Sequence, residues 1–192
     1  ITPDMTAWAA AGARRSEEAN SLANITVNNG SSGAATAYRF DNTREDSVNT
    51  GELGVRGKLQ TGSVGHEWVA TASLFDFDKK NAYAMDWRNT LATNLYGPVS
   101  TNLPAFSGTT LYGGDLANPL RTGTTRLTSF AVGDTLTLLD KRLLLTAGVR
   151  HQKIDIGNYA YGTAALTSRY EQSRTSPLLA AVDAAFALKM RF

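Results

Sequence analysis

The sequence contains no cysteine, and it carries little charge for a chain of 192 residues. Without cysteine the chain forms neither disulfides nor metal sites built on thiolates. Charged residues make up 19% of the chain, and the formal net charge is only +2. Because Lys and Arg are spread along the chain without a run, we expect no nucleic-acid partner. Apolar residues make up 42% of the chain, which disfavours disorder.

Long apolar runs are also missing. The longest, residues 178–188, carries Asp183 and is shorter than the roughly 18 residues that a transmembrane helix needs. A transmembrane β-strand crosses in about 9–11 residues, so this absence does not exclude a membrane location. The first four residues, Ile1 to Asp4, have none of the features of a signal peptide. We expect them to come from the interior of a longer protein.

Several segments instead place an apolar residue at every second position. The alternating apolar residues are Leu53, Val55 and Leu59; Leu143, Leu145 and Val149; and, from residue 177 to the end, Leu178, Ala180, Val182, Ala184, Phe186, Leu188, Met190 and Phe192. Successive side chains of a strand point to opposite faces, so this spacing predicts one apolar and one polar face. Long strands with two such faces are typical of outer-membrane β-barrels.

The polar residues between these apolar ones include charged side chains. We predict that Arg56, Lys58, Arg150 and Gln152 face the lumen of the barrel. A charge that faces lipid costs about 2–4 kcal/mol at the bilayer midplane. The residues that should therefore lie on the convex, lipid-facing side are Leu53, Val55, Leu59, Leu143, Leu145, Val149, Leu178 and Val182.

Six long strands are predicted. Their ranges are 5–15, 48–61, 67–78, 124–139, 143–159 and 173–192. Short turns at 62–65 and 140–142 alternate with long polar loops at 16–45, 79–123 and 160–172, which is the asymmetry of barrel turns and extracellular loops. The predicted fold is all-β: an antiparallel up-and-down transmembrane β-barrel sheet, partial because the smallest such barrels have about eight strands. Either the chain is part of a larger barrel, or the long loops contain further strands.

A series of short segments carries a family resemblance. They are NITVNNG (24–30), AYRFDNTR (37–44), TGELGVRGK (50–58), TGSVGH (61–66), DTL (134–136), LLLTAGVR (143–150) and YEQSRTSP (170–177). In this order they resemble the barrel of TonB-dependent siderophore receptors, over most of the chain. In that family a plug domain sits inside a barrel of about 22 strands. The receptors import ferric siderophores with energy from the TonB complex of the inner membrane.

The resemblance implies a location, partners and a function. Residues 1–192 would form one segment of the receptor barrel, without a plug domain or TonB box, in the bacterial outer membrane. The implied partners are outer-membrane lipid, a ferric siderophore as the transported ligand, and the TonB complex. No cofactor is expected.

Two other classes of protein remain open on the sequence. The terminal Phe192, with apolar residues at alternate positions before it, resembles the assembly signal of outer-membrane proteins. This favours a small outer-membrane β-barrel with an adhesive or structural role. A soluble β-sandwich is the other alternative, although strands of 12 or more residues exceed the roughly 3–10 that are usual in globular proteins.

The sequence predicts no catalytic residue, no metal site and no enzyme. His66 and His151 have no Asp or Glu at a metal-ligand spacing. Ligand contacts are expected in the loops, where aromatic rings and a guanidinium suit an anionic ferric chelate: Tyr83, Trp87, Arg88, Tyr96 and Tyr112. Aromatic residues at predicted strand ends, Trp8, Trp68 and Tyr159, are expected in the aromatic girdle at the membrane interface.

Overall fold

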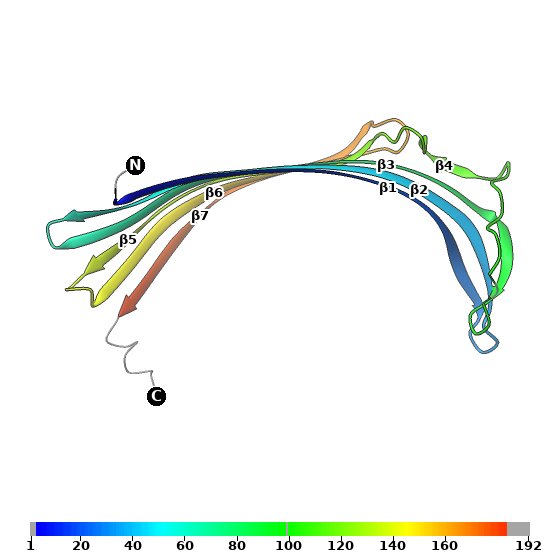
Figure 1. The fold of residues 1–192 in the computed structure, drawn as a ribbon, viewed down its shortest axis with the longest axis horizontal. Helices are drawn as coiled ribbons and strands as arrows, with labels where there is room; N and C mark the ends of the chain where they lie inside the picture. The colour runs from blue at the N-terminus through cyan, green and yellow to red at the C-terminus, as the bar shows by residue number, and fades with distance from the viewer. Residues whose placement is uncertain (1–2, 99, 184–192) are drawn as a thin grey trace.

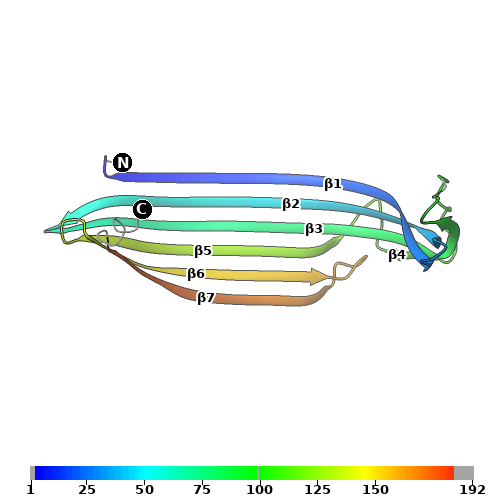
Figure 2. The same cartoon turned by 90° about the horizontal axis from the view of Figure 1, so that it is seen from below.

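The computed structural model describes residues 3–98 and 100–183, which form one curved antiparallel sheet (Figure 1). The strands are β1 (Met5–Asn29), β2 (Ala34–Thr61), β3 (Val64–Asn94), β4 (Leu111–Gly113), β5 (Arg121–Leu138), β6 (Leu143–Tyr159) and β7 (Leu166–Asp183). Six long strands lie in the order β1-β2-β3-β5-β6-β7, and the short β4 pairs with β3 (Figure 2). This confirms the predicted up-and-down sheet of six long strands. Within the described ranges, no helix is long and apolar enough to cross a membrane.

Two tight turns join the predicted hairpins. Thr61 pairs with Val64 across a two-residue turn, in which Gly62 has a φ of 60°. Glycine with positive φ at the first central position is the signature of a type II′ turn, whose twist matches that of the strands. Between β5 and β6, the backbone N–H of Arg142 donates to the carbonyl oxygen of Leu139 over 3.0 Å. The predicted pairing within both hairpins is confirmed.

The predicted long loops are mostly wrong. Residues 16–45 continue β1 and β2 as far as a turn at residues 30–33, and β3 continues to Asn94. The predicted loop at 79–123 contains the last part of β3, all of β4 and the start of β5. In these strand extensions polar residues occur on both faces, as Asp41 and Asn42 of β2 do, so the alternation of apolar residues is weaker there and backbone pairing defines the strands.

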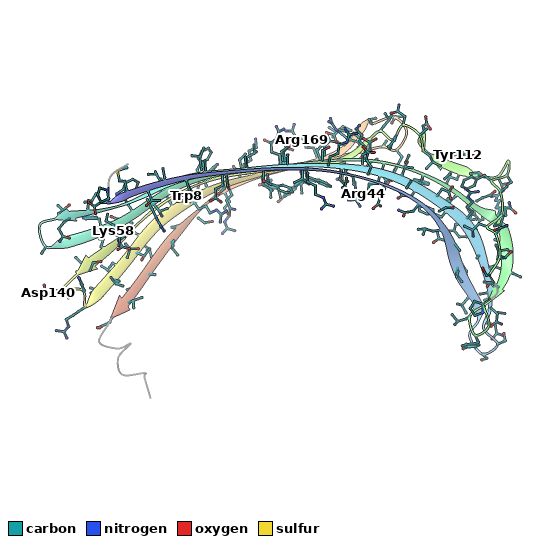
Figure 3. The ribbon with its side chains drawn as sticks, in the orientation of Figure 1. Trp8, Arg44, Lys58, Tyr112, Asp140 and Arg169 are labelled. Atoms are coloured by element: carbon teal, nitrogen blue, oxygen red, sulfur yellow. The ribbon has the colours of Figure 1, made fainter. Side chains whose placement is uncertain are left out.

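Cross-strand register assigns each side chain to one face, because paired residues point to the same side. Leu53 pairs with Ala72, whereas Arg56, three positions further along β2, pairs with Val69 on the other face. The face of Arg56 is concave: a hollow of about 850 Å³ there is lined by residues of all six long strands, among them Gly12, Thr50, Phe75, Gln152 and Arg174. Figure 3 shows Arg44 on this concave side and Arg169 on the convex side.

The half of the sheet near the tight turns is amphipathic. Its convex face carries Ala7, Ala9, Leu53, Val55, Ala70, Ala72, Phe130, Val132, Val149 and Leu179. Its concave face carries Arg56, Lys58, Ser73, Ser129, Arg150, Gln152, Arg174 and Ser176. An apolar convex belt and a polar concave wall are the two surfaces of a transmembrane β-barrel.

The predicted facing of Leu178 and Val182 is wrong. Leu178 pairs with Gly148 and Val182 pairs with Leu144, which places both on the concave side with Arg150. Residues 178–182 are apolar at every position, so alternation does not identify the lipid face there, and pairing with β6 decides it. The last positions of the predicted strand 173–192, from 184 to 192, lie outside the described residues.

Candidate ligand-binding face

The two faces of the sheet differ in how their cations are partnered. On the convex face, every Lys and Arg at a paired position of the six long strands forms an ion pair: Arg15 with Glu17, Arg39 with Asp41, Lys80 with Glu45, Arg121 with Asp78, Arg126 with Asp76, Lys153 with Glu171, and Arg169 with Asp155. On the concave face only Arg44 and Lys58 are paired with described carboxylates. Five concave cations have no such partner within the described residues: Arg14, Arg56, Lys79, Arg150 and Arg174. The concave wall therefore has an excess of positive charge.

An aromatic cluster lies on the concave face, in the strand extensions beyond the apolar belt. Tyr83 pairs with Asn42, on the same side as Arg44. The ring of Phe40 is stacked on that of Tyr83 at 6.1 Å between centroids. Tyr161, from the β6–β7 connection, meets Tyr83 edge to face at 5.0 Å. Such offset and T-shaped arrangements are the favoured geometries for aromatic pairs.

Amide groups surround this cluster. The side-chain amide of Asn42 donates to the Oδ1 atom of Asn81 over 2.5 Å, and the amide of Asn81 donates to the hydroxyl of Tyr161 over 3.4 Å. Arg44 lies nearby and is paired with Asp46 at 2.6 Å. The cluster thus combines ring faces with a few hydrogen-bonding groups, which is the usual composition of a ligand site.

A loop is attached to the convex side of the same strand extensions. Between the paired positions Tyr38–Thr90 and Phe40–Met85, residues 86–89 of β3 bulge opposite the single residue Arg39. The guanidinium of Arg39 lies 4.5 Å from the ring centroid of Phe106 in the loop. Its Nε and Nη2 atoms donate to Asp41 over 2.9 and 2.7 Å, and this guanidinium lowers the pKa of Asp41.

Asp86, the first residue of this bulge, is 1% exposed. Its carboxylate accepts hydrogen bonds from the hydroxyls of Ser107 at 2.6 Å, Thr109 at 2.7 Å and Thr110 at 3.2 Å, and from the backbone N–H of Ser107 at 3.0 Å. Asp86 lies 22 positions beyond Val64, well outside the roughly 9–11 residues that cross the bilayer. Hydrogen bonds from Ser107 and the two threonines outweigh burial and lower the pKa of Asp86 to about 2.

The five predicted ligand residues do not form one cluster. Tyr83 lies in the concave aromatic cluster, whereas Tyr112 pairs with Ala84 and lies on the convex side (Figure 3). Trp87 and Arg88 lie in the β3 bulge, with the guanidinium 4.7 Å from the indole ring centroid. The hydroxyl of Tyr96 donates to a backbone carbonyl at the β1–β2 turn. The sequence reasoning gave no ligand role to Phe40, which was noted only as part of the segment 37–44, and it did not single out Asp86.

The three predicted girdle residues also separate. Trp68 pairs with Asp134 on the convex face, near the tight turns, as a girdle residue would. Tyr159 ends β6 beside Arg121, whose guanidinium is 5.9 Å from the ring centroid. Trp8, however, pairs with Gly54 on the concave face, so its assignment to the girdle is wrong.

The histidines are bound to side chains of neighbouring strands. The Nδ1 atom of His66 lies 2.7 Å from the Oδ2 atom of Asp134, and that of His151 lies 2.9 Å from the hydroxyl of Thr175. Across the described ranges, no group of three or more His, Asp or Glu side chains is placed to hold a metal ion.

Together, the apolar convex belt, the basic concave wall and the up-and-down topology define a segment of a transmembrane β-barrel. No model of a known protein family matches the chain. The ferrichrome receptor FcuA of Yersinia enterocolitica is 25% identical over 178 residues, which cover 93% of this chain and 23% of that receptor.

Two solved structures share the fold. The ferric preacinetobactin receptor BauA from Acinetobacter baumannii matches 96% of this chain and 26% of its own, with a TM-score of 0.69 and 23% identity. The siderophore receptor PiuA from the same organism matches 94% of this chain and 27% of its own, with a TM-score of 0.51 and 16% identity. The chain therefore has the fold of a siderophore-receptor barrel segment, and it spans about a quarter of the length of these relatives.

Proposed function

We propose that residues 1–192 are part of the barrel of an outer-membrane receptor that takes up a ferric siderophore with energy from the TonB complex. The observation that carries the proposal is the excess of unpaired cations on the concave wall of a sheet whose convex face is apolar. Ferric siderophores are frequently anionic, and a wall lined by one sign of charge raises the local concentration of a ligand of the opposite sign. The similarity to receptors named for ferrichrome and ferric preacinetobactin supports the same class of ligand.

Within this function, we assign ligand contact to the concave aromatic cluster of Phe40, Tyr83 and Tyr161. The cluster lies on the same face as the basic wall and beyond the apolar belt, where a ligand from outside the cell would arrive first. Trp87, Arg88, Tyr96 and Tyr112 stay predicted contacts at the outer rim, where all four are exposed. Arg56, Lys58, Arg150 and Gln152 would line the lumen.

A non-enzymatic role follows from the same proposal, because binding and passage require no bond to be made or broken. The small-barrel alternative depended on further strands within residues 16–45 and 79–123. Apart from the three-residue β4, those residues lengthen existing strands. A β-sandwich requires a second sheet on the apolar face, and the described residues form a single sheet.

The test is uptake by the full-length reading frame. Expressed in a receptor-deficient strain under iron limitation, it should restore growth on at least one ferric siderophore from a panel of hydroxamates, catecholates and mixed chelators. The same plasmid in a strain without TonB is the matched control and should restore no growth. Surface-exposed protein that supports growth on no member of the panel would refute the proposal, and TonB-independent growth would refute its energy coupling.

A further inference from the structure

The buried carboxylate of Asp86 is unusual because no Lys or Arg of the described residues forms an ion pair with it. Among the described residues, it accepts hydrogen bonds from three hydroxyls and one backbone N–H, of Ser107, Thr109 and Thr110. A carboxylate taken out of water is costly unless its lone pairs are filled by donors. Four donors from one short loop fill them here, so the contact depends on that loop keeping one conformation.

The loop that Asp86 holds leads directly into the concave aromatic cluster. Thr110 is followed by β4, which pairs with Tyr83–Met85. A Cβ atom built on Gly113 would lie 2.1 Å from the Cε1 atom of Tyr83, so the ring lies directly against the glycine backbone. β4 therefore forms part of the surface on which the Tyr83 ring rests.

The next residue of the chain contacts the other side of the cluster. A Cβ atom on Gly114, which has a φ of 94°, would lie 3.2 Å from the backbone nitrogen of Gly162. Gly162 adjoins Tyr161, whose ring meets Tyr83 edge to face. The segment from Ser107 to Gly114 thus connects the Asp86 carboxylate on the convex side with two rings of the cluster on the concave side.

We propose that Asp86 is a positioning residue for ligand binding: by holding the 107–110 loop, it fixes β4 and thereby the orientation of Tyr83 and Tyr161. This inference rests on the proposed function, because it assigns the cluster to the ferric siderophore. Asp86 does not touch the ligand. It acts through the loop, and its contribution is preorganisation, which raises affinity by lowering the ordering cost of binding.

The experiment measures binding of a ferric siderophore to the purified full-length receptor. The Asp86→Asn variant keeps the shape of the side chain but places an NH₂ group against donors, so it should release the loop. We expect affinity to fall on the order of tenfold. Asp115→Asn, an exposed carboxylate in the same connection, is the matched control and should leave affinity unchanged.

A double-variant test distinguishes a positioning role of Asp86, exerted through Tyr83, from a general loss of stability in the variant. Gly113→Ala should displace the Tyr83 ring and lower affinity by itself, whereas Gly97→Ala, with no atom within 4 Å of the added Cβ, should not. If Asp86 acts through β4, the Asp86→Asn/Gly113→Ala double variant should lose little more affinity than either single variant. Additive losses would overturn the proposal.

The outcomes for this inference and for the proposed function are distinct. Wild-type receptor that binds no ferric siderophore would refute the proposed function. Wild-type receptor that binds, with an Asp86→Asn variant that binds equally well, would refute only the positioning role. Amide hydrogen exchange of residues 107–113 provides a second measurement, since the positioning role requires faster exchange there in Asp86→Asn while the rest of β3 stays protected.

Discussion

The indole ring of Trp8 on β1 lies flat against Gly54 of β2, on the concave face of the sheet. A Cβ atom on Gly54 would stand 2.1 Å from the Cζ2 atom of this ring. The indole Nε1–H donates to the Oε1 atom of Glu52 over 2.8 Å. The large ring of Trp8 is thus accommodated because its cross-strand partner is a glycine, Gly54. The indole N–H has a hydrogen-bond acceptor in Glu52, two residues before Gly54 on β2.

Gly54→Ala should therefore destabilise the β1–β2 pair. The added methyl group would push the Trp8 ring away and break its bond to Glu52, at a cost of about 1–3 kcal/mol for overpacking. Urea unfolding of the receptor in detergent, followed by tryptophan fluorescence, measures this cost. Gly51→Ala is the control, because its Cβ meets no atom within 4 Å. Equal stability of the two variants would contradict this packing.

Charge substitutions should distinguish the two faces of the sheet. Leu53→Arg introduces a cation on the convex apolar belt, and we expect a loss of about 2–4 kcal/mol in the free energy of unfolding in a lipid bilayer. Gln152→Arg introduces the same side chain on the concave wall and should cost far less. The measurement is folding into lipid vesicles across a denaturant series. Similar costs at both positions would contradict the assignment of the faces.

The concave cations should affect uptake more than stability. Arg150→Gln and Arg174→Gln remove two charges that have no described carboxylate partner, so we expect slower transport of an anionic ferric chelate, on the order of a few-fold. Uptake of radioactive iron by cells expressing the full-length receptor measures the rate. Lys153→Gln, on the convex face of β6, is the matched control. If electrostatic steering by these cations sets the rate, added salt should reduce the difference in uptake rate between the wild-type receptor and the arginine variants.

We expect the siderophore to contact the concave face of the sheet and not the convex side. Tyr83→Ala removes the central ring of the aromatic cluster, and we expect siderophore affinity to fall on the order of tenfold, as for other central aromatic anchors. Tyr112→Ala tests the rival site on the convex side. Equilibrium binding to whole cells compares the two variants. A loss only in Tyr112→Ala would move the ligand site to the convex side.

Acid should release the loop held by Asp86. The folded-state pKa of this carboxyl, about 2, lies below its ordinary value of 3.8. A lowered pKa means that the stabilising contribution is complete above about pH 4 and is lost as pH falls through the interval down to about 2. Hydrogen exchange at residues 107–110, corrected for intrinsic rates, should accelerate between these pH values. In Asp86→Asn the same segment should exchange rapidly at every pH.

The sequence predicted best where the two faces of a strand meet different surroundings. β6 runs over the predicted residues 143–159, and the inner parts of β2 and β3 also match, because each alternates apolar and polar side chains. Gly62 marked the β2–β3 turn because its missing Cβ permits the positive φ that the turn requires. Both signals are local, so they can be read without knowing the partner strand.

The candidate site was less accessible to sequence reasoning. Tyr83 was predicted as a ligand residue from its ring and its place beyond a strand, but its partners come from far along the chain. Phe40 reaches it from β2 and Tyr161 from the β6–β7 connection. No spacing in the sequence relates these three residues, and only the pairing of β2 with β3 and the return of the connection after β6 bring them together.

The sequence by itself determined the all-β class, the tight turns and the two faces of the inner strands, because side-chain alternation records a contrast between lipid and water. Where that contrast is absent, only the tertiary structure determined which residues form strands and which face their side chains occupy. In the extensions of β1, β2 and β3 polar residues occur on both faces, and at residues 178–182 every position is apolar, so backbone pairing sets the strand and its facing. The hold of Asp86 on residues 107–110 likewise depends on a bulge that exists only once β2 and β3 are paired.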